Sequence, residues 1–355
     1  MPSPTIHVYT LDEPAIKSFL AYLKPGLPHT LSVYRRLQFR HFSPDARIYS
    51  SISPSKLTIE HTPSDDANEP RQATEWITAY VDRSRSPETE VFMAGSWEIN
   101  TEASNADTNN STHSASALVQ ALITAVAQSP DPSPGNRQLT HDGINIYTSH
   151  LASPSLVLFG AVHVSTARIL RDLGYLASNT VVETDGLPEA YHRWVFDLRS
   201  AASPTRALDD GLSFGELKES DFALVRSRTS IPRQDRTLRL MPRVGVYDSL
   251  RNSSDDSSEN ALRREPIAWA FLGVDGSLST LHVEKEYRGR GIAKAVALRL
   301  WESELDAFGL GGVGERWGSA DVATYNRESN AVCKGLGGRV KYIDYWLRID
   351  LDKAR

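Results

Sequence analysis

The stretch 281–300, which reads LHVEKEYRGRGIAKAVALRL, constrains the fold of this chain more than any other. It predicts a short apolar strand, a turn with two glycines and two arginines, and then an amphipathic helix. Gly289 and Gly291 allow the backbone of the turn to approach a ligand closely. A helix start carries unpaired backbone N–H groups and the positive end of the helix dipole. The turn therefore indicates a pyrophosphate site, and Arg288 and Arg290 add positive charge beside it.

The pattern (Gln or Arg)-x-x-Gly-x-(Gly or Ala) is fitted, residue for residue, by the run Arg288-Gly289-Arg290-Gly291-Ile292-Ala293. This pattern marks the coenzyme A site of the GCN5-related N-acetyltransferases, and the preceding Leu281-His282-Val283 is also similar to that family. The stretch resembles the glycine N-acyltransferase-like branch in particular. A strand before the motif, a helix after it and a second motif downstream occur in the expected order, and such context makes a short motif more specific.

The second motif, residues 325–338, resembles another characteristic element of the family. In relatives an Asn before a helix helps to hold the pantetheine arm, and Asn326 has that position here. A Tyr seven residues later often donates a proton to the leaving thiolate, but this chain has Cys333 there. A thiol is protonated at neutral pH and can serve as an acid, although a free cysteine is more often a buried packing residue. Tyr325 is the alternative acid.

The general base has three alternatives. Many relatives place a Glu eleven positions before the first residue of the phosphate turn, and that position is Ser277 here. A serine hydroxyl is too weakly basic to act alone. The alternatives are a water held by Ser277, another base such as His282 or Glu284, and no acyl transfer at all. Strand alternation places His282 opposite Leu281 and Val283, which favours a hydrogen-bonded histidine at a strand end unless a bulge turns it.

Composition narrows the class of protein. The 355 residues suit two domains of roughly 150–190 residues each. Lys+Arg 39 and Asp+Glu 44 give a net charge of −5, so neither nucleic acid nor an anionic membrane is an expected partner. The single cysteine excludes an internal disulfide framework and a cysteine-based zinc site, and no metal is expected. Because the sequence has no signal-peptide pattern and no apolar stretch of membrane-spanning length, we expect a cytoplasmic protein.

Two domains are predicted around a connector that contains Ser, Pro and Asp, residues 200–211. Residues 1–199 are expected to form a degenerate acyltransferase-like domain, because a strand, a helix and Leu173-Gly174-Tyr175 resemble the end of that fold without its glycine-rich turn. An unrelated α/β domain is the alternative for this half. Residues 212–355 are expected to form the acyl-CoA-binding domain, with a polar loop at 249–261.

Hydrophobic periodicity and turn residues predict the secondary structure. Helices are expected at 14–23, 117–127, 166–173, 220–228, 234–240 and 292–308. Strands are expected at 31–39, 89–97, 144–149, 156–164, 212–217, 244–247, 267–272 and 278–283, and a loop at 101–116. The run 309–314 matches the dinucleotide pattern GxGxxG, but it follows a helix instead of a strand and is interpreted as a loop.

The resemblance implies an α/β fold in two tandem copies, with a mixed central sheet splayed so that an acyl-CoA inserts between two strands. It implies that backbone groups of Leu281, His282 and Val283 bind the acyl carbonyl and the pantetheine, and that the six-residue motif from Arg288 to Ala293 binds the pyrophosphate. The implied reaction transfers an acyl group, acetyl by default, to the amine of a small molecule. The alternatives are a noncatalytic acyl-CoA-binding protein and a natural-product tailoring enzyme that uses this fold for another reaction.

Overall fold

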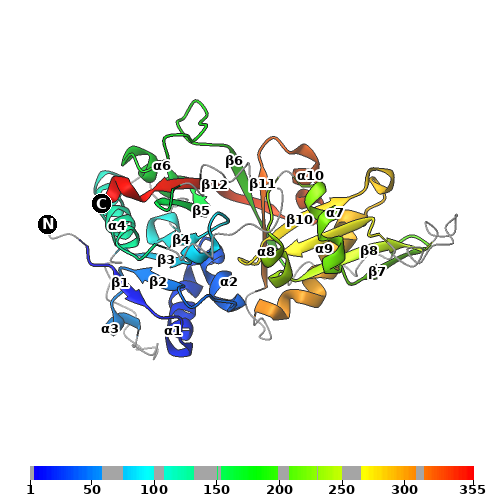
Figure 1. Ribbon diagram of the computed structural model, residues 1–355, viewed down its shortest axis with the longest axis horizontal. Coiled ribbons are helices and arrows are strands. Elements are labelled where there is room, and N and C mark those ends of the chain that lie inside the picture. The colour runs from blue at the N-terminus through cyan, green and yellow to red at the C-terminus, as the bar shows by residue number, and fades with distance from the viewer. Residues whose placement is uncertain are drawn as a thin grey trace. The chain divides into compact units, whose positions relative to one another are not determined.

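The computed structural model describes residues 4–57, 75–99, 108–131, 150, 153–198, 208–229, 231–249, 265–308 and 316–355. These residues form two compact units (Figure 1). The first unit is built from Met1–Leu139, Ile144–Ala190 and Ile343–Arg355, and the second from Tyr191–Tyr342. The predicted domains follow the chain without interruption, whereas the units do not: the first includes the end of the chain, and the second begins before the predicted connector.

In the first unit the sheet order is β1 (His7–Tyr9), β2 (Arg47–Ser50), β3 (Ile77–Val81), β4 (Val91–Gly95), β5 (Leu156–His163) and β12 (Arg339–Asp350, which enters this unit at Ile343). Neighbouring strands are antiparallel except β4 and β5, which are parallel, so the sheet is mixed. The helices are α1 (Glu13–Leu23), α2 (Leu31–Phe39), α3 (Pro54–Leu57), α4 (Thr108–Ala127) and α6 (Val164–Asp172). Asp12 begins α1 by accepting a hydrogen bond from the Ala15 N–H at 2.9 Å.

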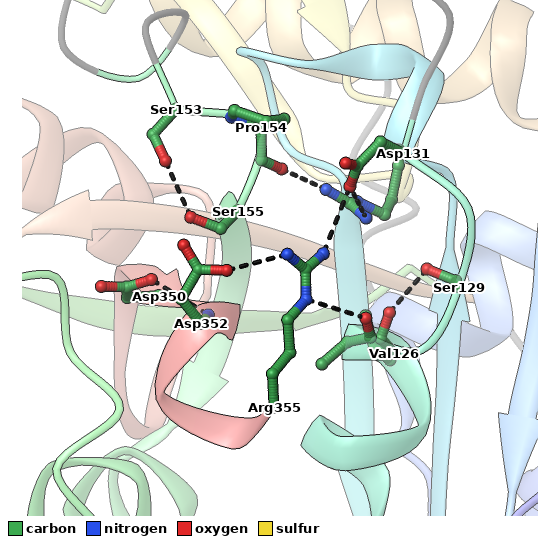
Figure 2. A network of polar contacts seen from close by, with 11 residues as sticks. Val126, Ser129, Asp131, Ser153, Pro154, Ser155, Asp350, Asp352 and Arg355 are labelled. Carbon is green, nitrogen blue, oxygen red and sulfur yellow. Dashed lines mark hydrogen bonds and ion pairs between the residues drawn. The ribbon is translucent and has the colours of Figure 1, made fainter.

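The end of the chain completes the core of the first unit. Leu347, Ile349 and Leu351 are fully buried in the same apolar cluster as residues of β3, β5 and α4. Figure 2 shows the polar contacts around the last residue: the Arg355 guanidinium pairs with Asp352 at 2.8 Å and with Asp131 at 3.5 Å. Asp131 also pairs with Arg83, whose guanidinium donates a hydrogen bond to the carbonyl of Pro154. The last thirteen residues are therefore an integral part of this unit.

The second unit contains a four-stranded antiparallel sheet and a further strand pair. The sheet order is β10 (Leu278–Val283), β9 (Ala268–Leu272), β8 (Arg243–Asp248) and β7 (Leu212–Gly215). The strand pair is β6 (Ala190–Asp197, within this unit from Tyr191) and β11 (Trp317–Ala323), which are antiparallel. The helices are α7 (Phe222–Ser227), α8 (Asp235–Leu240), α9 (Ile292–Glu304) and α10 (Arg327–Gly335), and α9 packs on β8, β9 and β10 (Figure 1).

Two predicted elements of the first unit are wrong. The segment predicted as a strand at 31–39 is helix α2, and eight of its nine residues are buried, including the polar Ser32, Arg35 and Arg36, so its polar residues do not mark an exposed face. The predicted loop 101–116 gives way to α4 from Thr108, because Ala115, Leu118 and Leu122 pack into the core and stabilise a polar first turn. The predicted strand 144–149 and most of the predicted loop 249–261 and of the connector lie outside the described residues.

The predicted fold class is confirmed, since helices pack on a mixed sheet. In the described part of the chain, no helix has both the length and the apolar character needed to cross a membrane.

Candidate functional site

The turn between β10 and α9 has the conformation of a phosphate cradle. Gly289 and Gly291 both have left-handed backbones, with φ of 77° and 81°, and Gly291 is the residue that precedes α9. The N–H of Ala295 donates to the carbonyl of Gly291 at 3.2 Å as the first bond of the helix. The N–H groups of the three residues before Ala295 therefore lack an acceptor within the helix, and they are available to an anion at this helix start.

The space beside the cradle fits a ligand. A Cβ atom built on Gly289 would meet no protein atom within 4 Å, so the backbone there faces open space. Arg288 donates from Nε to the carbonyl of Val283 at 2.9 Å, which ties the turn to the end of β10. Arg290 pairs with Asp209 at 2.8 Å and lies over the ring of Tyr287, 5.5 Å from its centroid. The side chains of both arginines therefore brace the turn from within the protein.

Strand β10 carries a bulge in its middle. Its pairing with β9 shifts between Ser279 and His282, and Thr280 between them has a left-handed φ of 53°. The backbone at Thr280 and Leu281 therefore leaves the regular ladder with β9.

Strands β10 and β11 diverge. Within the described residues of this unit, no ladder joins them, and Ser277, the residue before β10, forms an isolated parallel bridge with Ser319 of β11. Beyond this bridge β11 pairs with β6, while β10 stays with β9. The sheet is therefore splayed next to the bulge, and the cradle lies at the far end of β10.

Two predicted base candidates lie in different environments. The Ser277 hydroxyl is buried and donates to Asp275 Oδ1 at 2.7 Å. His282 stacks on the buried Trp269 ring, with centroids 4.7 Å apart, and its Nε2 lies 3.6 Å from Glu284 Oε2. Burial lowers the pKa of His282, so its imidazole is neutral at neutral pH. Glu284 in turn pairs with Arg228 at 2.9 Å, and that ion pair lowers the pKa of its carboxyl although burial opposes this.

The residues of the second motif lie at the start and in the middle of α10. Asn326 caps the helix, because its side-chain oxygen accepts the Ser329 N–H at 3.0 Å. Cys333 is 2% exposed, and burial, together with the charge of Asp321, raises the pKa of its thiol to about 12. Tyr325 is 71% exposed. The structure thus places the predicted acids in opposite settings, one in the core and one at the surface.

A family model confirms the resemblance. The model described as the acyl-CoA N-acyltransferase verG N-terminal domain matches residues 4–194, more than half of the chain. This chain belongs to the acyl-CoA N-acyltransferases. No curated protein matches it in sequence.

Three solved structures align with this chain over almost its whole length. A protein of Drosophila is 14% identical, covers 98% of this chain and 99% of its own, and has a TM-score of 0.57, which shows the same fold. A tandem GNAT protein from the clavulanic acid biosynthesis pathway is 10% identical, with 97% of each chain covered and a TM-score of 0.43. A GCN5-related N-acetyltransferase from Sphaerobacter thermophilus is 11% identical, covers 98% of this chain and 96% of its own, and has a TM-score of 0.44.

Three charged residues of this chain are grouped beside Ser277, and sequence analysis did not identify them. Arg193 of β6 is fully buried and pairs with both carboxylate oxygens of Asp321 at 2.7 and 2.6 Å. The same nitrogen lies 3.9 Å from Asp275 Oδ2. Arg193 precedes the predicted connector, so nothing in the local sequence placed it next to β11. Asp275 lies in the hairpin before β10, outside the strand on which the family pattern places a base.

The first unit of the chain also has two parallel strands, but its own side chains bridge their ends. Strands β4 and β5 pair at two positions. After them, the Trp97 indole N–H donates to Thr166 Oγ1 at 3.0 Å, and the Thr166 hydroxyl donates to Glu98. A Cβ built on Gly95 would lie 2.4 Å from the Trp97 ring, so the indole covers the end of β4. The place that corresponds to the splay of the second unit is therefore filled.

The buried Glu98 makes the stability of the first unit depend on pH. Burial raises its pKa to about 7 in the folded state, from an ordinary value of 4.5. A raised carboxyl pKa stabilises the fold fully below pH 4.5, and this contribution is lost as the pH rises to about 7. We expect Glu98→Gln to become more stable relative to the wild type over this interval, by on the order of 3 kcal/mol. Urea unfolding monitored by Trp fluorescence at several pH values measures the free energy of unfolding of both proteins. A difference between them that does not change with pH would contradict the prediction.

Proposed function

We propose that this protein uses an acyl-CoA, acetyl-CoA by default, to acylate the amine of a small molecule by direct attack. The observation that carries the proposal is the cradle, in which Gly289 and Gly291 open the backbone at the start of α9. Backbone amides of the cradle would hold the pyrophosphate. The pantetheine would follow β10 toward the bulge, where peptide groups outside the ladder can bind the acyl carbonyl.

The second unit would hold a single acyl-CoA per chain. Its support is the contrast between the two parallel strand pairs: β10 and β11 diverge beside a bulge, whereas Trp97, Glu98 and Thr166 bridge the ends of β4 and β5. Calorimetry with coenzyme A should therefore give a stoichiometry of one. The cytoplasmic location and a small-molecule amine as the acceptor stay predictions from the sequence.

The acid that protonates coenzyme A is better assigned to Tyr325 than to Cys333. A thiol whose pKa is raised to about 12 gives up its proton less readily than an ordinary thiol, and Cys333 packs in the core. We expect Cys333→Ala to keep kcat within about threefold and to lower the free energy of unfolding by on the order of 1 kcal/mol. Tyr325→Phe should lower kcat about tenfold or more. A tenfold loss of kcat in Cys333→Ala at unchanged KM would return the acid role to the thiol.

A noncatalytic acyl-CoA-binding protein is the second candidate. It is favoured by Ser277 at the position where relatives often have Glu, and by the buried Cys333 at the position of their Tyr. It predicts coenzyme A binding without acyl transfer.

A thiol-release screen separates the two candidates. Amino acids, polyamines and arylamines are offered with acetyl-CoA and with longer acyl-CoAs, and free coenzyme A is measured against time. Release that depends on the amine, with the acylated amine found by mass spectrometry, supports the transferase. Coenzyme A binding without release from any pair supports the binding protein.

A further inference from the structure

We propose that Asp275 is the proton acceptor of the acyl transfer and that the Ser277 hydroxyl passes the proton to it. This inference rests on the proposed function. It explains how a serine can stand where relatives often have a Glu base. A hydroxyl that donates a hydrogen bond to a carboxylate can accept a proton from an amine while it passes its own proton to the carboxylate.

The geometry of the hairpin aligns the two groups. Ser277 Oγ donates to Asp275 Oδ1 at 2.7 Å, and the backbone N–H of Ser277 donates to the same oxygen at 3.3 Å. The turn is closed by the Gly273 N–H, which donates to the Ser277 carbonyl at 2.7 Å. Asp275 is 4% exposed and Ser277 is 9% exposed. The carboxylate is thus removed from bulk water, and Ser277 lies between it and the next strand.

Ser277 lies at the splay of the sheet. It forms the parallel bridge with Ser319 of β11, and it directly precedes β10, whose bulge follows at Thr280. The hydroxyl is therefore close in the chain to the peptide groups that would bind the acyl carbonyl.

The charges around Asp275 favour proton uptake. Among the residues that the structure describes, the charged groups that act on it are Arg193 of β6, whose Nη1 is 3.9 Å away, and Asp321 of β11, which holds Arg193 with both oxygens. One buried cation and two carboxylates carry a net charge of −1, and one added proton makes the group neutral. Because a net charge is costly in a buried site, protonation of Asp275 is favoured. Burial accordingly raises the pKa of Asp275, although Arg193 and the hydrogen bonds from Ser277 oppose the shift.

The first unit contains the same local arrangement in a different electrostatic setting. Ser84 donates to Asp82 Oδ1 from its hydroxyl at 2.6 Å and from its N–H at 3.2 Å, so Asp82-x-Ser84 matches Asp275-x-Ser277 in its hydrogen bonds. Asp82 is also fully buried, but Arg85 lies 3.6 Å away, and hydrogen bonds from Ser84 and Ser43 together with the charges of Arg85 and Arg36 lower its pKa despite burial. Asp82 is therefore a structural aspartate and a matched control.

The proton balance of the step is complete. The ammonium of the acceptor gives one proton to Ser277 Oγ as the Ser277 proton moves to Asp275, and the free amine attacks the thioester carbonyl carbon. A C–N bond forms, the C–S bond breaks, and sulfur leaves as the thiolate. Tyr325 protonates the thiolate and regains a proton from the second N–H of the amine, and Asp275 returns its proton to solvent.

The test uses Asp275→Asn, Ser277→Ala and Asp82→Asn in the full chain, with the amine that reacts fastest in the thiol-release screen. Asn keeps an oxygen that can accept the Ser277 N–H, so the turn is retained while basicity is lost. We expect Asp275→Asn and Ser277→Ala to lose 100-fold or more of kcat, with KM for acyl-CoA and coenzyme A affinity within about twofold. The kcat of Asp275→Asn should rise about tenfold per pH unit below the pKa of the amine, since only free amine reacts. Asp82→Asn should keep wild-type kcat.

A rescue separates a proton acceptor from a structural turn. Ser277→Glu in the Asp275→Asn background places a carboxylate on the strand side, and it should restore kcat at least tenfold. Asp275→Asn with kcat within threefold of the wild type would overturn the relay alone. Equal losses of kcat and coenzyme A affinity without rescue would also overturn it, because they indicate a structural role. An inactive wild type that binds coenzyme A would overturn the proposed transferase and the relay together.

Discussion

Replacement of Gly289 by Trp should weaken coenzyme A binding at least 100-fold. At a φ of 77° the residue lies in the turn before α9, and no protein atom would contact its Cβ within 4 Å. The indole can therefore be accommodated by the protein, but it would occupy the volume in which the pyrophosphate meets the helix amides. Titration calorimetry with coenzyme A measures the affinity of the variant and of the wild type.

Gly174→Trp is the matched control for this experiment. Gly174 follows α6 in the first unit, has a φ of 79°, and has the same clearance around a built Cβ. Both variants lose glycine's freedom in the left-handed region, at about 1–2 kcal/mol of stability each. Only the variant in the cradle should lose coenzyme A. Equal affinities of the two variants would remove the cradle from the proposed function.

Ile349→Asp should unfold the first unit. Ile349 of β12 is fully buried, pairs with Val157 of β5 and forms a bridge with Leu176. An unpaired carboxylate in this core costs several kcal/mol, a large share of the 5–15 kcal/mol that typically stabilise a domain. Thermal unfolding followed by circular dichroism, together with limited proteolysis, should show the loss of this unit.

Val340→Asp tests the same chemical change on the same strand. Val340 is 43% exposed, so a carboxylate there stays hydrated, and its effect should be within about 0.5 kcal/mol. If Ile349→Asp melted at the temperature of Val340→Asp, β12 would not hold the first unit together.

The sequence predicted the second unit better than the first because local patterns dominate it. The strand predicted at 278–283 and the helix start predicted at Ile292 agree with the structure. The glycines between them mark a turn, because both adopt left-handed backbone conformations that favour glycine. In the first unit, α2 is buried on nearly all sides, and its buried residues include the polar Ser32, Arg35 and Arg36. Hydrophobic periodicity assigns a helix by separating a buried face from an exposed one, so it does not assign a helix that is buried on all faces.

The candidate site was predictable only where it is made of backbone. The cradle needs glycine at two positions, and this requirement is visible in the residue string. The Asp275–Ser277–Arg193 group requires contacts between a hairpin and β6, a strand that precedes the predicted connector. Such a contact depends on which strand joins which sheet, and no local pattern encodes that choice. The same reason explains why β6 and the end of β12 were assigned to the other domains.

The membership of β12 in the first unit also has a consequence for biosynthesis. Domains of a growing polypeptide commonly fold in the order in which they leave the ribosome. Here Leu347, Ile349 and Leu351 are translated after the residues of the second unit, and the sheet of the first unit remains open at β5 until they emerge. A nascent chain halted at residue 342 would hold a nearly complete second unit and an unfinished first one. The unit that begins at the N-terminus would therefore finish folding after the unit that follows it.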